Sequence, residues 1–252
     1  MPRADKPQLV FITGASSGLG AALARHYGQQ GAVLGLCGRR EEALAQAAAG
    51  LNAHCFIADV RDPGAMRDAA EKFLALVGTP DIVIGCAGIS VGALTEEASD
   101  LPVFQAVMDA NVMGLVHTFQ PFIAPMRSAG GGVLCGIASV AGVRGLPGGG
   151  AYSASKAAAR VYLEALRLEL KARGVKVVTV SPGYIDTPMT QVNPYPMPFK
   201  MSVATAANKV VRAIERGSRH AVIPWQMAWV AALLTGLPNP VYDALFEKAP
   251  RK

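Results

Sequence analysis

Short runs of consecutive apolar residues alternate with helix-like segments along almost the whole chain, and this alternation restricts the fold more than any other feature. The runs are continuously apolar, as expected of strands that are covered on both faces. Because strand–helix–strand units of this length form right-handed crossovers, the sequence predicts an α/β fold with one doubly wound parallel sheet and helices on both faces. Seven strands are expected, at 9–12, 32–37, 54–57, 81–85, 132–137, 175–180 and 220–223.

The intervening segments have helical periodicity, and Pro121 marks a candidate break in the longest of them. Helices are expected at 18–30, 41–49, 63–77, 101–126, 152–173 and 203–215. The chain has 252 residues, of which 51% are hydrophobic, so it can bury a large core. No linker or internal repeat interrupts the alternation, and we therefore expect a single domain over 1–252.

The charge pattern makes nucleic acid an unlikely partner. The formal net charge is +6, and residues 187–242 hold five basic side chains against one acidic one. Elsewhere lysine and arginine alternate with acidic residues and lack aromatic neighbours, unlike a nucleic-acid-binding stripe. The polar N-terminus has no apolar signal sequence, which predicts a cytoplasmic location.

The four cysteines indicate a reducing compartment, which agrees with a cytoplasmic location. Cys37, Cys55, Cys86 and Cys135 form no C-x-x-C pair and no metal-ligand spacing, so no metal site and no disulfide framework are expected. We interpret all four as small buried apolar residues.

A glycine-rich segment directly follows the first strand and begins the first helix. Its glycines would allow positive φ angles and close backbone approach, while the helix N-terminus presents free N–H groups to a pyrophosphate. The spacing is G-x-x-x-G-x-G, at the first strand–helix junction, which favours a dinucleotide over a simple tight turn. The loop residues predicted to contact the cofactor are Gly14, Ser16, Ser17, Gly18, Leu19 and Gly20.

Arg39 and Arg40 follow the second strand, where the adenosine ribose lies in a dinucleotide-binding fold. An acidic residue there would accept hydrogen bonds from the ribose 2′-hydroxyl and repel a 2′-phosphate. Because two arginines stand there instead, NADP(H) is preferred to NAD(H), with a phosphate contact expected from at least Arg39. The alternative is that both arginines pair with the glutamates that follow them.

Tyr152 and Lys156 are four residues apart on a strongly periodic helix, so their side chains share one face. Ser139 follows the fifth strand at its carboxyl end, where open parallel sheets bind their ligands. A nearby ammonium would lower the phenol pKa from its usual value of about 10, and the serine hydroxyl would hold a carbonyl oxygen. These three residues predict proton transfer, with Tyr152 as the general acid or base.

With these motifs, the chain resembles the short-chain dehydrogenase/reductase family over essentially its whole length. The resemblance is also carried by Asn111 and by three short segments that follow the third, fourth and sixth strands, namely Asp59-Val60, Cys86-Ala87-Gly88 and Pro182-Gly183. It implies a Rossmann-type fold with further cofactor contacts from Asp59, Val60, Cys86, Ala87, Gly88, Tyr152, Lys156, Pro182, Gly183, Ile185 and Thr187. It also implies catalytic roles for Asn111, Ser139, Tyr152 and Lys156, in which Asn111 holds a water of a proton relay.

One residue departs from the family pattern. The family usually has Asn-Ala-Gly after the fourth strand, and this chain has Cys86 in place of the asparagine. Loss of that amide is expected to loosen a structural hydrogen bond without removing activity, because Ser139, Tyr152 and Lys156 are intact.

The segment after Gly183 is expected to form a substrate lid at about 184–216. Its first part is rich in apolar and aromatic residues, which either contact an apolar carbonyl compound or pack the lid against its own domain. Arg144, in the loop between Ser139 and Tyr152, is expected to be solvated, with contact to an anionic substrate group as the alternative.

The C-terminal segment at about 221–246 is apolar and contains Trp225 and Trp229. The segment between its flanking prolines is too short to cross a bilayer as a helix, so no transmembrane segment is expected. We expect it to be buried against the lid or a second subunit. Basic residues at 209–219 leave open a peripheral membrane contact as the alternative.

The sequence as a whole predicts an NADP(H)-dependent oxidoreductase. It would transfer a hydride between the nicotinamide and a carbonyl or secondary alcohol of a hydrophobic small molecule, with Tyr152 as acid or base. A membrane-surface enzyme that acts on a lipid-like substrate is the first alternative, and a nonenzymatic NADP-sensing module is the second. A homodimer or homotetramer is expected, because the helices around 111–126 and after Tyr152 resemble the family's dimer faces.

Overall fold

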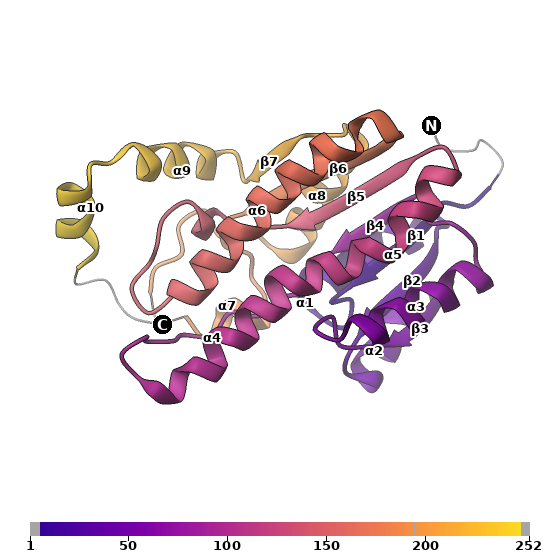
Figure 1. Ribbon diagram of the computed structural model, residues 1–252, viewed down its shortest axis with the longest axis horizontal. Coiled ribbons are helices and arrows are strands. Elements are labelled where there is room, and N and C mark those ends of the chain that lie inside the picture. Colours follow the sequence, from indigo (N-terminus) through magenta and orange to yellow (C-terminus); the bar gives the residue numbers. More distant parts are fainter. Residues whose placement is uncertain (1–5, 194, 248–252) are drawn as a thin grey trace.

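The computed structural model describes residues 6–193 and 195–247; Pro194 of the expected lid and both ends of the expected 1–252 domain lie outside these residues. Seven parallel strands form one sheet in the order β3-β2-β1-β4-β5-β6-β7 (Figure 1), which confirms the doubly wound arrangement. The strands are β1 (Leu9–Thr13), β2 (Val33–Gly38), β3 (Ala53–Ile57), β4 (Ile82–Gly85), β5 (Gly132–Ile137), β6 (Val175–Pro182) and β7 (His220–Ile223).

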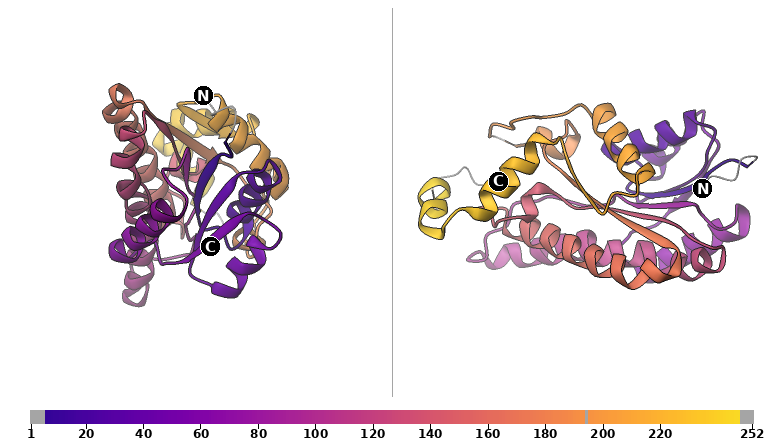
Figure 2. Two further views of the ribbon diagram at one scale, coloured as in Figure 1. Left: turned by 90° about the vertical axis from the view of Figure 1, so that its right-hand side faces the viewer. Right: turned by 90° about the horizontal axis from the view of Figure 1, so that it is seen from above.

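Helices cover both faces of this sheet, as Figure 2 shows from two further directions. One face carries α1 (Gly18–Gln29), α2 (Glu41–Ala48) and α8 (Val203–Glu215). The other carries α3 (Pro63–Leu76), α4 (Leu101–Met108), α5 (Gly114–Ser128) and α6 (Gly150–Leu170). Each face therefore has its own buried core, and the strands between the two cores are apolar on both sides.

The core under α3 and α5 is built around four phenylalanine rings. The Phe11 ring lies 5.4 Å from Phe73 and 4.8 Å from Phe122, measured between centroids, and Phe56 lies 5.8 Å from Phe11. Gly35 of β2 provides the space for two of these rings, because a Cβ atom there would lie 2.5 Å from Phe73 and 2.6 Å from Phe11. Close packing of large rings on a glycine fixes how α3 sits on the sheet.

Two local expectations are wrong. Pro121 does not break the long helical segment; it lies inside α5, and the irregularity is instead a π-helical turn at Asp109–Met113 between α4 and α5. Cys55 is exposed, not buried, because β3 is the edge strand of the sheet, whereas Cys37 and Cys135 are buried.

The segment from Tyr184 to Met201 is held at its base, where Ile185 and Met201 are buried in the core on the α1 face of the sheet. Ile185 forms an isolated bridge with Met201, and Met201 N–H donates to the Tyr184 carbonyl. This segment includes the short helix α7 (Pro188–Gln191). The helix α8, which the sequence analysis included in the lid, packs on α1 and belongs to a core.

The last described elements are two helices, α9 (Gln226–Gly236) and α10 (Asn239–Phe246), which project from one end of the sheet (Figure 1, Figure 2). Trp225 and Trp229 are 64% and 73% exposed, so the expected burial of these tryptophans against the lid is wrong for the single chain. Contact with a second subunit and contact with a membrane both stay predictions. Across the described residues, no helix is both long enough and apolar enough to span a bilayer.

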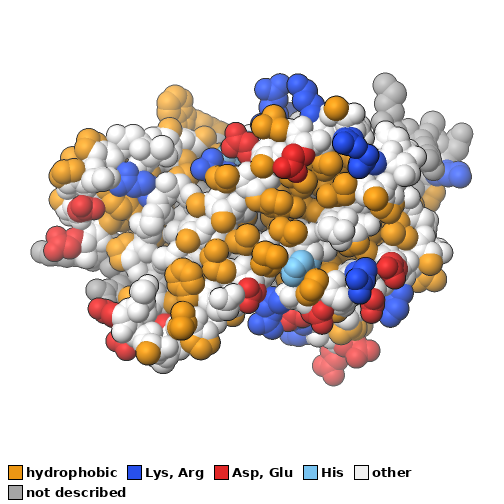
Figure 3. Space-filling view, in the orientation of Figure 1, with side chains coloured by type: hydrophobic (Ala, Val, Ile, Leu, Met, Phe, Trp, Pro, Cys, Tyr) orange, Lys and Arg blue, Asp and Glu red, His pale blue; other side chains and the backbone are white. Residues whose placement is uncertain are grey.

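A second exposed apolar surface lies over α5 and α6. Figure 3 shows hydrophobic side chains gathered across the middle of this face. Met113 lies just before α5, Val161 and Leu168 lie on α6, and all three are among the exposed large apolar side chains. These are the helices for which the sequence analysis expected a contact between subunits.

Enlarging Gly35 tests the aromatic core. Gly35→Ala should lower the free energy of unfolding by about 1–3 kcal/mol, because the added methyl group overpacks Phe11 and Phe73. Urea denaturation monitored by circular dichroism measures this change. Gly150→Ala is the matched control, since nothing lies within 4 Å of a Cβ atom there. Equal stability of the two variants would show that the rings do not depend on Gly35.

Candidate active site

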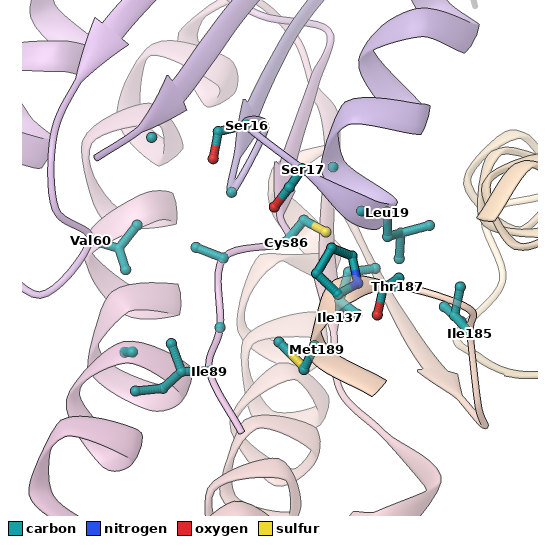
Figure 4. Close-up of a pocket in the computed structure, with 18 of the residues that line it drawn as sticks. Ser16, Ser17, Leu19, Val60, Cys86, Ile89, Ile137, Ile185, Thr187 and Met189 are labelled. Atoms are coloured by element: carbon teal, nitrogen blue, oxygen red, sulfur yellow. The ribbon is translucent and has the colours of Figure 1, made fainter. Parts of the chain in front are cut away.

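A cavity of about 300 Å³ lies at the carboxyl edge of the sheet, where the strand order changes direction between β1 and β4. Open parallel sheets bind their ligands at this position. Every residue that the sequence analysis expected to contact a cofactor lines the cavity, from Gly14 of the first loop to Thr187 after β6. Figure 4 shows side chains from these separate segments facing one space, with Ser16 and Ser17 on one side and Thr187 and Met189 on another.

The glycine-rich loop needs its glycines for close packing. Gly14 and Gly18 have φ angles of +68° and +53°, which other residues adopt at a cost. A Cβ atom on Gly14 would lie 2.7 Å from Ala87 Cα, and one on Gly20 would lie 2.2 Å from the Gly14 carbonyl oxygen. The loop thus packs against the segment after β4, and α1 begins immediately at the cavity.

Ser17 is the N-cap residue of α1, and its side chain makes no capping hydrogen bond. Both Ser17 and the first residues of α1 line the cavity. The N-terminal N–H groups of a helix have no partners within the helix and carry a partial positive charge. This end of the cavity therefore suits a phosphate group.

Guanidinium groups gather at the end of the cavity beside β2. The Arg40 Nη2 atom lies 3.4 Å from Ser16 Oγ and 3.3 Å from Ser17 Oγ, so this side chain extends over the loop. Arg39 is exposed, and its Nη1 atom lies 3.8 Å from Asp59. Neither arginine pairs with the glutamates at 41 and 42 in any of the ion pairs of the described residues.

Asp59 is held by a residue that the sequence analysis missed. Arg61 lines the same cavity and donates to both carboxylate oxygens of Asp59, at 2.6 Å for Nη2 to Oδ2 and 3.1 Å for Nε to Oδ1. These hydrogen bonds lower the pKa of the Asp59 carboxyl group. No motif identifies Arg61, because its position depends on the turn that joins β3 to α3.

Ser139, Tyr152 and Lys156 meet on the opposite side of the cavity, as the sequence analysis expected. Lys156 Nζ donates to the Ile137 carbonyl at 2.8 Å and lies 5.8 Å from the centroid of the Tyr152 ring. Gly142 lets the loop after Ser139 rest on α6, since a Cβ atom there would lie 2.7 Å from the backbone of Lys156. The serine and the tyrosine are thereby held side by side.

The pKa of Tyr152 differs from the expectation. Burial raises the pKa of its phenol, and a hydrogen bond with Ser139 opposes this only in part. Lys156 does not lower it, because its ammonium group faces the Ile137 carbonyl; burial lowers the pKa of Lys156 itself to about 8. At pH 7 both groups are therefore protonated.

Asn111 lies behind this group and does not line the cavity. Its Oδ1 accepts from Ile89 N–H at 2.8 Å, while its Nδ2 donates to the Ile89 carbonyl and to Ser155 Oγ, both at 2.9 Å. A Cβ atom on Gly88 would lie 2.8 Å from this Oδ1 and 3.5 Å from Lys156 Nζ. The side chain thus fixes the strand end after β4 beside the lysine, and its part in a proton relay stays a prediction.

Cys86, which replaces the family's asparagine, faces the cavity (Figure 4). Burial raises the pKa of its thiol to about 12, so it is a neutral group at physiological pH. The neighbouring Ala87 N–H donates to Thr13 Oγ1 at 3.4 Å, a long hydrogen bond. The expected loosening of a structural hydrogen bond by Cys86 stays a prediction.

A second cavity of about 390 Å³ adjoins the first and shares Ser139 and Tyr152 with it. Its far walls come from three segments: the loop after Ser139, the segment after Gly183, and the C-terminal helices. The apolar wall residues include Val140, Leu146, Met189, Met227, Val230, Leu234 and Phe246. A compound in this cavity would place its polar end at Tyr152 and its apolar part toward α9.

The expected apolar lid residues divide into three groups. Met189 and Tyr195 line the second cavity, whereas Ile185 and Met201 are buried at the base of the segment. Val192 and Phe199 point to solvent. The apolar composition therefore has two causes, cavity lining and packing, and the sequence does not separate them. For the first cavity, the sequence did not indicate several other lining residues, namely Gly38, Ala58, Ile89, Ala110, Ile137, Ala138, Pro188 and Thr190.

Arg144 was expected to be solvated, with contact to an anionic substrate group as the alternative. It is partly buried, it lines the second cavity, and it makes structural contacts. Its Nη1 donates to the Leu237 carbonyl at 3.1 Å, and its guanidinium carbon lies 4.0 Å from the centroid of the Tyr242 ring. The residue therefore joins the loop after Ser139 to the C-terminal helices.

An all-parallel doubly wound sheet with a glycine-rich loop at its switch point defines a Rossmann-type protein. A sequence model described as short chain dehydrogenase matches residues 8–195. An uncharacterized oxidoreductase of Myxococcus xanthus is 36% identical over 242 residues, which cover 93% of this chain and 94% of the relative. The chain therefore belongs to the short-chain dehydrogenase family and is an oxidoreductase of that family.

Two further similarities support this membership. A 3-ketodihydrosphingosine reductase of Bacteroides thetaiotaomicron is 34% identical over 246 residues, covering 94% of this chain and 87% of the reductase. The crystal structure of a short-chain dehydrogenase from Streptomyces avermitilis has a TM-score of 0.79 at 25% identity, covering 90% of this chain and 92% of that one. Members of the family use NAD(H) or NADP(H) and act on small molecules.

Proposed function

We propose that this protein is an NADP(H)-dependent oxidoreductase that interconverts a carbonyl group and a secondary alcohol of a hydrophobic small molecule. The observation that carries the proposal is the meeting of two cavities at Ser139 and Tyr152. One has the loop and the arginines of a dinucleotide site, and the other is apolar. A nonenzymatic sensor of NADP(H) would need neither the proton-transfer residues nor the second cavity.

The residues of the first cavity fit a dinucleotide. The glycine-rich loop and the N-terminus of α1 line it together, and the free N–H groups of that helix end would hold a pyrophosphate. Asp59 and Val60 would flank the adenine, with Lys156 at the nicotinamide ribose. Residues after β4 and β6 would surround the nicotinamide, namely Cys86, Ala87, Gly88, Pro182, Gly183, Ile185 and Thr187.

The preference for NADP(H) over NAD(H) rests on charge. Arg39 and Arg40 stand at the end of β2, where a 2′-phosphate would lie, and both line the cavity. Asp59, the nearest carboxylate, is tied to Arg61 and partly neutralised by it. Arg40 extends over Ser16 and Ser17, so it is the better placed of the two arginines to reach the phosphate.

Tyr152 acts as a general acid in the direction of reduction. Its phenol is protonated at neutral pH because burial raises its pKa, so it can donate its proton to a substrate carbonyl oxygen. The Ser139 hydroxyl would hold that oxygen, and the Lys156 ammonium would donate to the nicotinamide ribose. The bound cofactor would supply the hydride.

The apolar second cavity supports a hydrophobic substrate, and one relative favours a lipid-like one as a second candidate. The reductase of Bacteroides thetaiotaomicron is named for a ketone of the sphingoid base class, and it matches 94% of this chain. The exposed tryptophans of α9 suit an enzyme that meets such substrates at a membrane surface. We also propose a homodimer or homotetramer, formed through the apolar surface over α5 and α6.

Removal of the phenol hydroxyl tests the role of Tyr152. Tyr152→Phe should lower kcat by a factor on the order of 10²–10⁴, because it removes the proton donor. The Kd of NADPH, measured by fluorescence titration, should change less than about threefold, since the ring is kept. A variant that keeps more than half of the wild-type kcat while chemistry limits the rate would exclude Tyr152 as the acid.

Cofactor preference can be tested on the two arginines. Arg40→Ala, Arg39→Ala and the double variant should each bind NADPH more weakly, by about 10- to 100-fold per lost charge-assisted contact. Binding of NADH should stay within about twofold. Arg25→Ala, an exposed position on α1 away from the cavity, is the control. If both cofactors lose affinity equally, the arginines have a structural role only.

The pKa of Lys156 predicts a pH dependence. With Lys156 titrating near 8, kcat/KM for NADPH should be constant below that pH and fall as the pH rises through it, because the ammonium loses its proton. Tyr152 stays protonated over this range, since its pKa is raised. Steady-state rates from pH 6 to 10 measure the profile. A flat profile over the whole range would contradict a charged Lys156 in the reaction.

A further inference from the structure

The C-terminal arm, residues 225–246, has two different apolar faces. Met227, Val230 and Leu234 lie on one side of α9 and line the second cavity. Trp225, Trp229 and Leu233 lie on the other side, each more than 60% exposed. The arm is therefore a thin wall with the cavity on its inner side and solvent on its outer side.

The sheet holds this wall at only one end. Met227 packs at the end of β6, where a Cβ atom on Gly183 would lie 2.7 Å from Met227 Cγ. Apart from Met227, the only other buried residue of α9 and α10 is Tyr242. The far end of the arm thus depends on what holds Tyr242.

Tyr242 and Arg144 form that attachment. Arg144 Nη1 donates to the carbonyl oxygens of Leu234 and Leu237, at 3.4 and 3.1 Å, at the C-terminal end of α9. Its Nη2 donates to Asn239 Oδ1 at 3.1 Å. The same guanidinium lies over the Tyr242 ring, and Tyr242 Oη donates to the Gly145 carbonyl at 2.6 Å.

These contacts have a clear physical basis. The last carbonyl groups of a helix have no partners within the helix, and a cation at that end is stabilised by the helix dipole. A guanidinium can donate to several carbonyls in its plane and stack on an aromatic ring at the same time. A lysine could supply the charge, but it lacks the planar fork that joins these groups.

We propose that Arg144 and Tyr242 are positioning residues that hold the arm as the far wall of the second cavity, and that this wall selects carbonyl compounds with an extended apolar chain. The chain would run from Tyr152 along Met227, Val230 and Leu234 toward Phe246. The substrate class rests on the proposed function, whereas the attachment of the arm does not.

Chain-length dependence tests the selection. For methyl ketones from 2-butanone to 2-undecanone, the wild-type kcat/KM should rise with length, by up to about fourfold per buried methylene. Arg144→Ala should reduce this slope by more than half on a logarithmic scale. It should leave kcat for 2-butanone within about twofold, because Ser139 and Tyr152 stay in place. A parallel loss at every length, or an unchanged slope, would overturn the proposal.

Two milder variants guard against simple misfolding. Tyr242→Phe keeps the ring under the guanidinium and loses the hydrogen bond to Gly145, so its slope should lie between those of wild type and Arg144→Ala. Arg144→Lys should resemble Arg144→Ala, because it lacks the fork. Arg67→Ala, an exposed position on α3, is the control and should match wild type. Full recovery of the slope by Arg144→Lys would reduce the role of Arg144 to its charge and contradict the proposed fork.

A binding measurement separates this inference from the proposed function. Calorimetric titration with 1-decanol, without cofactor, should show that wild type binds the alcohol and that Arg144→Ala binds it at least tenfold more weakly. In the same variant, amide hydrogen exchange should become faster in α9 and stay unchanged in α6. Decanol binding that depends on Arg144, in a protein that reduces no ketone, would refute the proposed function alone. If Arg144→Ala changes neither ketone reduction nor decanol binding, the proposed role of the arm alone is refuted.

Discussion

Close approach of backbone segments at the carboxyl edge of the sheet is the constraint on which the site depends. Gly14 rests on Ala87, Gly20 rests on the Gly14 carbonyl, and Gly88 leaves room for the Asn111 amide beside Lys156. A Cβ atom at any of these positions would lie less than 3.0 Å from a neighbouring atom, so the neighbour would have to move. Because glycine stands there, the ends of β1 and β4 and the start of α1 border one cavity.

The same principle places the proton-transfer residues on the other side of the cavity. Leu163 of α6 fills the space over Gly136 of β5, and Gly142 lets the loop after Ser139 rest on the backbone of Lys156. These contacts fix α6 against the strand that precedes Ser139, so Lys156 reaches the Ile137 carbonyl. The position of each reacting group thus follows from packing in the core, and its pKa follows from the burial that this packing causes.

The sequence predicted the seven strands and the helices on both faces of the sheet because apolar runs and helical periodicity are local signals. It predicted the cavity because strand ends of a parallel sheet meet at one edge. It failed where tertiary contacts decide. Arg61 pairs with Asp59 only because a turn brings them together. Tyr242 donates to Gly145, which lies 97 residues earlier in the chain, and it also contacts Arg144. The pKa of Tyr152 was misjudged because helical spacing does not show where Lys156 Nζ points.

The connection between Ser139 and Tyr152 joins chemistry to substrate enclosure. One end of this loop carries the serine hydroxyl, the other leads into the helix of the tyrosine, and its middle carries Arg144 and Gly145, which contact the C-terminal helices. The same loop therefore borders both cavities at Ser139 and holds the wall of the second one through Arg144 and Gly145. In such an arrangement one loop supplies the serine for the polar end of a ligand and also holds the wall that contacts its apolar part.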